Sequence, residues 1–316
     1  MPECVGILWN CTSVGATFPP TGCSCIAVDS PNIFTLLHVA LANRHALTTQ
    51  DQTDVADLVK GHSLESPYWL LAHGLLHYLG LGQDKTPARK PMWLEFGVFA
   101  GRSSNITCDA FARVGRTRAR VHGFDSFEGL PTAWGRMPKG RFTLHGVMPP
   151  VRPCATLHKG LIKPDEGVWP EWLAQPQHEA SSVALLGASI DVDLYAPAFA
   201  ALHNLHRRGL LRAGSLLHFH EMVQPFTMAD STLYGPAADP ARWQKKIAAR
   251  MKPRERAVPF DEQRALVDLL RLSVGMSVWL VPLHAGQKTD AALVVVVAPG
   301  HVNHAQASVG GSASAS

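Results

Sequence analysis

The sequence predicts an α/β fold in which a mainly parallel sheet carries helices on both faces. From residue 92 onward, short apolar runs alternate with amphipathic stretches, and this rhythm is typical of strands that are each followed by a helix. The 316 residues are 46% hydrophobic and 17% charged, which is a globular composition with material for one sizeable core. We therefore expect a doubly wound, Rossmann-like sheet.

The expected strands are apolar runs that are too short for helices and are bounded by polar or glycine-containing segments. The last two flank the loop HAGQKTD, which suits a hairpin. The runs are MWLEFG (92–97), RVHGFD (120–125), ATLHK (155–159), VALLGASID (183–191), GSLLHFH (214–220), SVWLVPL (277–283) and AALVVVVA (291–298).

Amphipathic stretches between and before these strands predict helices. Their apolar residues recur three or four positions apart, so that one helical face is apolar. In one of them, Ser66 and Pro67 are suited to a cap and a first turn. The predicted helical stretches are 33–47, 63–82, the segment from Ile106 to Val114, and 196–211.

The pattern divides the chain into three parts. Residues 1–61 form an N-terminal helical extension of unclear structure, residues 62–299 form the α/β domain, and residues 300–316 form a flexible tail. The polar connector QDKTPARKP (83–91) is the clearest break in the pattern. The tail contains SVGGSASAS, which has no core-forming residues.

Charge and hydropathy limit the classes of binding partner and the cellular locations that we expect for the protein. The run at 291–298 is far shorter than the roughly 20 residues of a membrane helix, so we expect a soluble protein. The N-terminus lacks the features of a secretory signal, and we expect a cytoplasmic location, although its scarcity of acids leaves organellar targeting open. A net charge of +4 does not imply nucleic acid, and the basic run at 242–256 lacks interleaved aromatic residues.

The six cysteines do not form a recognisable metal motif. The early cysteines offer C-x-C rather than the C-x-x-C spacing of zinc sites, so we interpret them as reduced thiols. The two later cysteines lie in apolar surroundings and are interpreted as small core residues. The cysteines are Cys4, Cys11, Cys23, Cys25, Cys108 and Cys154.

The segment WLEFGVFAGRSSN (93–105) ends the first strand with an acid and two glycines before a helix begins. In a doubly wound sheet, ligands bind outside the carboxyl ends of the strands, where glycines allow close approach of the backbone. Asp125 ends the second strand, where an acid can accept hydrogen bonds from ribose hydroxyls. The spacing of Glu95, Gly97, Gly101 and Asp125 therefore predicts a nucleoside-containing cofactor.

The glycine pattern also bears on which cofactor binds. A dinucleotide fold requires G-x-G-x-x-G to cradle a pyrophosphate, and this chain lacks the third glycine. The departure favours a cofactor without phosphates, and S-adenosylmethionine fits because it combines adenosine, a sulfonium and an amino acid. An NAD(P)-dependent dehydrogenase is a less favoured alternative.

Further strings strengthen this interpretation. HGFDSFEGLP (122–131) is followed by IDVDLY (190–195) and then by AGSLLHFHE (213–221). In order and spacing, these strings resemble the macrocin O-methyltransferase-like family of class I S-adenosylmethionine-dependent methyltransferases, over residues 66–298. The resemblance implies a seven-stranded sheet with a reversed last strand, and methyl transfer to a hydroxyl, often on a sugar of a natural product.

The resemblance implies cofactor contacts at matching positions. The acid and glycines of the first strand end would line the methionine end, Asp125 would hold the ribose, and the next two residues would lie beside the adenosine. Residues after the third strand would lie in the adenine pocket. The implied cofactor-binding residues are Glu95, Gly97, Gly101, Asp125, Ser126, Phe127, Lys159 and Gly160.

The resemblance also implies a metal site, at which this chain departs from the family. Relatives use the acid matching Asp191 and an acidic pair after the fifth strand to bind magnesium, which orients the acceptor hydroxyl. This chain has His220 and Glu221 at the pair. Imidazole is a poor ligand for magnesium and suits manganese, iron or zinc. Either Asp191, His220 and Glu221 bind a changed metal, or the site is lost and Asp191 alone acts as base.

The sequence thus predicts an S-adenosylmethionine-dependent O-methyltransferase for a small-molecule acceptor such as a sugar. Asp191 and His145 are the catalytic candidates, and His145 could act as a base because imidazole titrates near neutrality. The alternative is a degenerate methyltransferase fold that binds a cofactor or a partner. We expect no nucleic-acid or membrane partner, and a homo-oligomer is compatible with the sequence.

Overall fold

The computed structural model describes residues 7–11, 23–27, 49–60, 66–78, 89–135, 137–222, 261–280 and 291–302. The expected helix at 33–47, the basic run at 242–256 and residues 303–316 of the tail lie outside this set. None of the helices in these ranges is long and apolar enough to cross a membrane.

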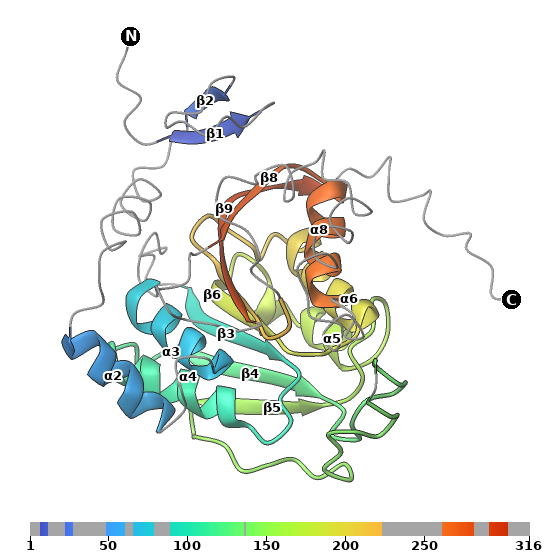
Figure 1. The fold of residues 1–316 in the computed structure, drawn as a ribbon. Helices are drawn as coiled ribbons and strands as arrows, with labels where there is room; N and C mark the ends of the chain where they lie inside the picture. Colours follow the sequence, from blue (N-terminus) through green and yellow to red (C-terminus); the bar gives the residue numbers. More distant parts are fainter. Residues whose placement is uncertain are drawn as a thin grey trace, which may run out of the picture.

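A 7-stranded sheet in the order β5-β4-β3-β6-β7-β9-β8 forms the centre of the fold (Figure 1). The first five strands of this order are parallel, whereas β9 runs antiparallel to both of its neighbours. The predicted α/β class is confirmed. The strands are β3 (Lys90–Phe96), β4 (Arg120–Asp125), β5 (Ala155–Lys159), β6 (Val183–Ile190), β7 (Leu216–Phe219), β8 (Ser273–Leu280) and β9 (Ala292–Val302).

Helices cover both faces of the sheet. One buried apolar cluster joins α2, α3 and α4 to the sheet, and another joins α5, α6 and α8 to it. Strand β3 serves both clusters, because successive side chains of a strand point to opposite faces of the sheet. Trp93 belongs to the first cluster, whereas Leu94 and Phe96 belong to the second. The helices are α2 (Thr49–Val59), α3 (Pro67–Tyr78), α4 (Arg102–Arg113), α5 (Val168–Leu173), α6 (Tyr195–Arg207) and α8 (Asp261–Leu272), and a short 3-10 helix η2 (Pro176–His178) follows α5.

The N-terminal extension differs from the predicted helical segment. Strands β1 (Ile7–Cys11) and β2 (Cys23–Ala27) pair antiparallel in a separate sheet, and α2 is the helix described within residues 1–61. The strings ILWNC and CSCIA contain β-branched and aromatic residues, which favour strands. Neither strand was predicted, because the first sixty residues show mixed patterning.

The interpretation of Cys108 and Cys154 as small core residues missed a covalent bond between them. The two residues form a disulfide between α4 and the segment that leads into β5, with their Cα atoms 5.9 Å apart. The apolar surroundings were predicted rightly, since both residues lie in or against the cluster of α2, α3 and α4. The pairing was missed because the residues are 46 positions apart and only the packing of α4 beside β5 brings them together.

Candidate functional site

The site lies where the strand order reverses. Strand β3 pairs with β4 on one side and with β6 on the other, so the chain leaves β3 toward one edge of the sheet and later returns to fill the other. In open α/β sheets, this switch point opens a crevice at the carboxyl ends of the strands. Glu95, Asp125, Asp191 and His220 all lie at or just after the ends of β3, β4, β6 and β7.

Gly97 lets the ends of β3 and β6 approach each other. Its φ is +85°, and a Cβ at this position would lie 1.7 Å from the carbonyl oxygen of Asp191. The Gly97 N–H donates to the Phe124 carbonyl (2.9 Å), and the Asp191 N–H donates to the Phe96 carbonyl (2.8 Å). Any side chain at residue 97 would therefore separate the strand ends that form the site.

Asp125 holds the loop that follows β3. One carboxylate oxygen accepts the backbone N–H groups of Val98 and Phe99, each at 2.8 Å, and the other accepts that of Phe127 at 2.7 Å. An ionised carboxylate offers about four lone-pair sites, so these bonds leave roughly one for a ligand. The predicted ribose contact of Asp125 stays a prediction.

Glu95 lies beneath this loop rather than on its surface. The side chain is 1% exposed, and its two carboxyl oxygens accept hydrogen bonds from the hydroxyls of Ser103 and Ser104 at the start of α4. Burial raises the pKa of Glu95 to about 7, although both hydroxyl bonds oppose the rise. Glu95 can therefore change its charge near neutral pH when a cation binds nearby.

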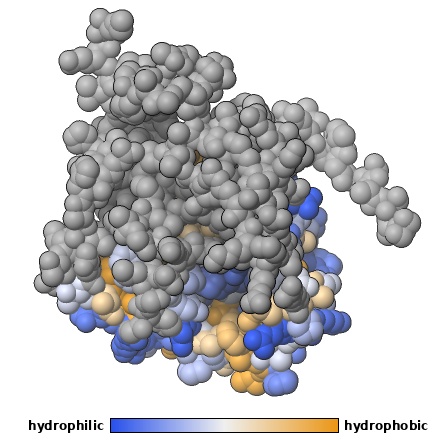
Figure 2. All heavy atoms as spheres, viewed as in Figure 1, coloured by the Kyte–Doolittle hydropathy of each residue, from blue (hydrophilic) through white to orange (hydrophobic). Residues whose placement is uncertain are grey.

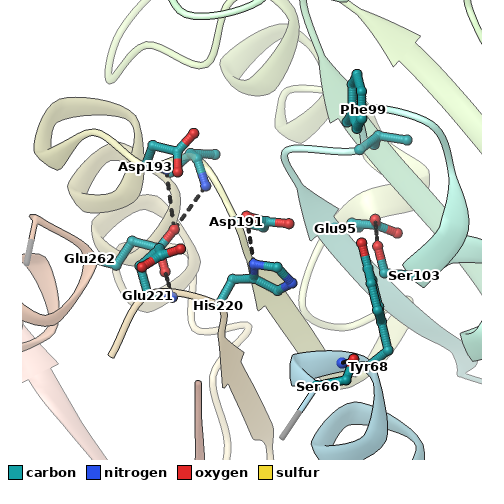
Figure 3. Close-up of polar contacts among 12 residues, drawn as sticks. Ser66, Tyr68, Glu95, Phe99, Ser103, Asp191, Asp193, His220, Glu221 and Glu262 are labelled. Atoms are coloured by element: carbon teal, nitrogen blue, oxygen red, sulfur yellow. Dashed lines mark hydrogen bonds and ion pairs between the residues drawn. The ribbon is translucent and has the colours of Figure 1, made fainter. Parts of the chain in front are cut away.

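Asp191 and His220 form a pair across the ends of β6 and β7. The Oδ1 atom of Asp191 lies 3.2 Å from the Nδ1 atom of His220 (Figure 3). Burial, followed by the charges of Glu262 and other nearby acids, raises the pKa of Asp191 well above its usual range. Burial lowers the pKa of His220 to about 4. The pair therefore favours a state with an uncharged imidazole.

Glu262, at the start of α8, ties together the loops that follow β6 and β7. Its Oε1 atom accepts the N–H groups of Val192 (2.9 Å) and Asp193 (3.2 Å), and its Oε2 atom accepts that of Glu221 (3.0 Å) (Figure 3). The side chain is fully buried, and burial raises its pKa to about 8. Sequence analysis did not identify Glu262. The acidic first turn of the amphipathic stretch DEQRALVDLLRL was the available signal.

Tyr68, from α3, is a second residue that sequence analysis did not identify. Its ring centroid lies 5.6 Å from that of His220, and the guanidinium carbon of Arg102 lies 5.5 Å from the ring centroid. Burial and the charge of Asp191 raise the pKa of the Tyr68 phenol, so this hydroxyl stays protonated at neutral pH. Tyr68 thus brings an aromatic ring from α3 against the imidazole of His220.

The geometry does not support the predicted metal centre. Within the described ranges, no three or more His, Cys, Asp and Glu side chains are arranged to hold a metal ion. The Nδ1 atom of His220 faces Asp191, and the backbone of Glu221 is bound by Glu262. The donors of Asp191, His220 and Glu221 are thus brought to one region without forming a ligand set.

The remaining predicted residues lie around the ends of β4 and β5. Ser126 accepts the N–H of Glu128 (3.1 Å), and the Lys159 ammonium donates to the carbonyl of Gly146 (2.8 Å). Phe127 is 1% exposed, with a φ of +59°, and the N–H of Gly160 donates to the Asp125 carbonyl (2.9 Å). These contacts place Ser126, Phe127, Lys159 and Gly160 on the Asp125 side of the switch point.

His145 is in the same region, apart from the Asp191–His220 pair. It is exposed and has a φ of +54°. The N–H groups of its neighbours Leu144 and Gly146 both donate to the carbonyl of Phe127. In the ranges described, the imidazole of His145 makes no hydrogen bond or ring contact with Asp191 or His220. Its predicted role as a base stays a prediction without support from this arrangement.

Several apolar side chains are exposed on the same side of the switch point as Asp125. Phe99, in the loop after β3, is 44% exposed and makes an edge contact with Phe142, with the ring centroids 5.8 Å apart. Val147 and Met148 are 66% and 50% exposed. Figure 2 shows the described surface in one view as largely hydrophilic with apolar patches between. Flat apolar groups beside a strand end are suited to contact with a ligand ring.

Comparisons with known proteins give weak similarities. No protein-family model and no curated protein matches the chain. Among solved structures, the calicheamicin methyltransferase CalS11 shares 19% identity with a TM-score of 0.46, over 85% of this chain and 94% of that chain. The O-methyltransferase NovP shares 13% identity with a TM-score of 0.36, over 72% and 77% of the chains. An O-methyltransferase from Bacillus cereus in complex with SAH shares 14% identity with a TM-score of 0.35, over 86% and 92%. Because these TM-scores are below 0.5, the proposals below rest on the chain's own geometry.

Proposed function

We propose that this chain is an S-adenosylmethionine-dependent methyltransferase that methylates a hydroxyl of a small molecule. The observation that carries the proposal is the meeting of Glu95, Gly97, Asp125 and Asp191 at the switch point of the sheet. Crevices at this position bind nucleoside-containing ligands in doubly wound folds. The antiparallel β9 adds support, because the family resemblance implies a reversed last strand.

The residues present fit such a cofactor at two points. Asp125 keeps acceptor capacity for a ribose hydroxyl after its three backbone bonds. Glu95 is a buried carboxyl with a pKa of about 7, and it can ionise when a cationic methionine group lies near the turn. Both features suit a ligand that is cationic at one end and carries a ribose at the other.

Bound S-adenosylmethionine would supply an electrophilic methyl group on its sulfonium. The chain's own residues would then hold the acceptor oxygen in line with the methyl carbon and take up the hydroxyl proton. Asp191 and His220 are the titratable pair at the ends of β6 and β7, next to the switch point, and the Tyr68 ring lies beside His220. The acceptor site is therefore proposed on the Asp191 side and the adenosine site on the Asp125 side.

The two alternatives have less support. A dehydrogenase that binds a dinucleotide would need a pyrophosphate cradle, and the loop 97–101 lacks the G-x-G-x-x-G pattern. A degenerate methyltransferase fold would explain the change to His220, but it gives no reason for the Asp191–His220 pair. No observation favours either alternative over the methyltransferase.

Calorimetric titration of the full chain tests the proposal. We expect S-adenosylmethionine and S-adenosylhomocysteine to bind and NAD to leave the protein unaffected. Asp125→Asn should weaken binding of both adenosyl ligands, by about 1.5–3 kcal/mol for loss of a charged hydrogen-bond acceptor. Incubation of S-adenosylmethionine with panels of sugars and phenols, with detection of S-adenosylhomocysteine, would then identify acceptors. Binding of NAD in preference to both adenosyl ligands would contradict the proposal.

A further inference from the structure

The Asp191–His220 pair has the geometry of an oriented base. The Nδ1 atom of His220 lies 3.2 Å from Oδ1 of Asp191, and the backbone N–H of His220 donates to the Ile190 carbonyl at 3.0 Å. The first contact orients the imidazole ring, and the second holds the backbone of His220 in place. In its ionised form, the Asp191 carboxylate accepts a hydrogen bond from Nδ1–H and so holds the ring in the tautomer that leaves the lone pair on Nε2.

The Nε2 atom of His220 lacks a partner. It is buried and has no hydrogen-bond partner within the described part of the chain. A buried polar atom without a partner is destabilising, and at a strand end a bound ligand group can satisfy it. The group that would satisfy a lone pair on Nε2 is a hydrogen-bond donor, and the acceptor hydroxyl of the proposed reaction is one.

Burial disfavours a charge on either member of the pair. Tyr68 of α3 lies beside the imidazole, with ring centroids 5.6 Å apart, and His218 of β7 lies edge-on at 6.1 Å. Burial first, and then Glu262 of α8 with the neighbouring Asp193 and Glu221, raise the pKa of Asp191. Since burial lowers the pKa of His220 to about 4, a lone pair is available on the ring at neutral pH.

We propose that His220, oriented by Asp191, accepts the proton of the acceptor hydroxyl during methyl transfer, without a divalent metal ion. The inference rests on the proposed function. The acceptor oxygen forms its bond to the methyl carbon as the carbon–sulfur bond breaks, and the electron pair of that bond stays on sulfur. The hydroxyl proton moves to Nε2, the Asp191 carboxylate stabilises the imidazolium through Nδ1–H, and the proton is then released to solvent.

Nitrogen NMR of the histidine-labelled full chain with S-adenosylhomocysteine tests the assignment without an acceptor. His220→Gln identifies the His220 signals, and His203→Gln, on α6, serves as the matched control. We expect a neutral ring at pH 7 with its proton on Nδ1, unchanged by MgCl2 or MnCl2. Asp191→Asn should reverse the tautomer, because an amide can donate to Nδ1. With an acceptor from the panel, His220→Gln should lower kcat by ~10²–10⁴ with little change in KM, and EDTA should have no effect.

The outcomes separate this inference from the proposed function. A proton on Nε2 in the wild-type protein, or a shift of the His220 signals by MgCl2 or MnCl2, would overturn the role of His220 as a metal-independent base. Full turnover by His220→Gln would overturn it as well. Failure of S-adenosylhomocysteine to bind in calorimetry would instead count against the proposed function, and the tautomer of His220 could still be read in the free protein.

Discussion

The carbonyl oxygen of Asp191 lies where the side chain of residue 97 would begin, because a Cβ built on Gly97 would be 1.7 Å from it. No pair of non-bonded heavy atoms tolerates that separation. The contact joins the end of β3 to the end of β6, and so it fixes the distance between the cofactor side and the acceptor side of the candidate site.

Gly97→Ala should therefore damage both stability and binding. We expect a loss of at least 1–3 kcal/mol of unfolding free energy in denaturant titration, together with loss of S-adenosylhomocysteine binding in calorimetry. Gly115→Ala is the matched control, since Gly115 has a similar φ of +71° but nothing within 4 Å of its Cβ position. Equal losses in the two variants would mean that backbone strain alone is responsible.

Binding of S-adenosylmethionine near neutral pH should release protons from Glu95. The pKa of Glu95 is raised to about 7, so this carboxyl is partly protonated in the free protein at pH 7. A nearby cation favours the ionised form, so binding should lower the pKa and tighten as pH rises from 6 to 8. Calorimetry in buffers of different ionisation enthalpy measures the released protons. Glu95→Gln should abolish the dependence, and an unchanged proton release in this variant would assign it to another group.

Local chemistry made the positions of Gly97 and Asp125 at strand ends predictable. Gly97 and Asp125 follow apolar runs directly, and their roles depend on what a strand end in a parallel sheet presents. The further contribution of Asp125, as acceptor for three backbone N–H groups, was not readable, because it depends on how the loop after β3 folds back.

The remaining features depend on contacts between residues that are far apart in the sequence, and so they could not be predicted from local patterns. Glu262 reaches Val192 across 70 positions, and nothing near it in sequence indicates that its carboxyl is buried. Cys108 and Cys154 looked like ordinary core residues until α4 was placed beside β5. The predicted metal triad lacks support for the same reason, since within the described ranges these residue types are not arranged as a ligand set.

Glu262→Gln should loosen the loops that carry Asp191 and His220. A glutamine keeps one oxygen for the N–H groups of Val192 and Asp193, but its amide nitrogen cannot accept the N–H of Glu221. One buried N–H left without an acceptor costs about 1–3 kcal/mol, which denaturant titration can measure. Because the pKa of Glu262 is raised from 4.5 to about 8, its contribution to stability is full below pH 4.5 and is lost as pH rises from 4.5 to 8. The glutamine variant should lack that decline, and a persistent decline would implicate Asp191 instead.

Removing the disulfide should destabilise the domain without removing the cofactor site. Cys108 and Cys154 close a loop with a sequence separation of 46, for which unfolded-chain entropy gives about 4 kcal/mol. We expect Cys108→Ala and reduction of the wild-type protein to lower Tm by similar amounts. Thermal unfolding with and without dithiothreitol measures both, and the variant itself should be insensitive to dithiothreitol. A reductant effect on Cys108→Ala would point to other cysteines.

A cluster of three histidines beneath the β4–β5 edge should make the fold acid-sensitive. His122 Nδ1 lies 3.1 Å from His158 Nε2, and His178 lies against Trp172 with its ring centroid 3.6 Å away. Burial, followed by the neighbouring histidines, lowers the pKa of His122 to about 4, and burial also lowers the pKa values of His158 and His178.

Below pH 6.5, these histidines are therefore protonated in the unfolded chain but remain neutral in the folded protein. The free energy of unfolding should fall steadily from pH 6.5 to 4. The buried carboxyls Glu95 and Glu262 act in the opposite direction over part of this range, because their raised pKa values stabilise the protein as pH falls. A variant isolates the histidine contribution: His122→Phe keeps an aromatic ring against Trp172 and removes one titrating group. Urea titrations at several pH values should show a shallower acid loss for His122→Phe than for the wild type. Parallel profiles would mean that His122 takes up its proton without unfolding, and that the acid sensitivity arises elsewhere.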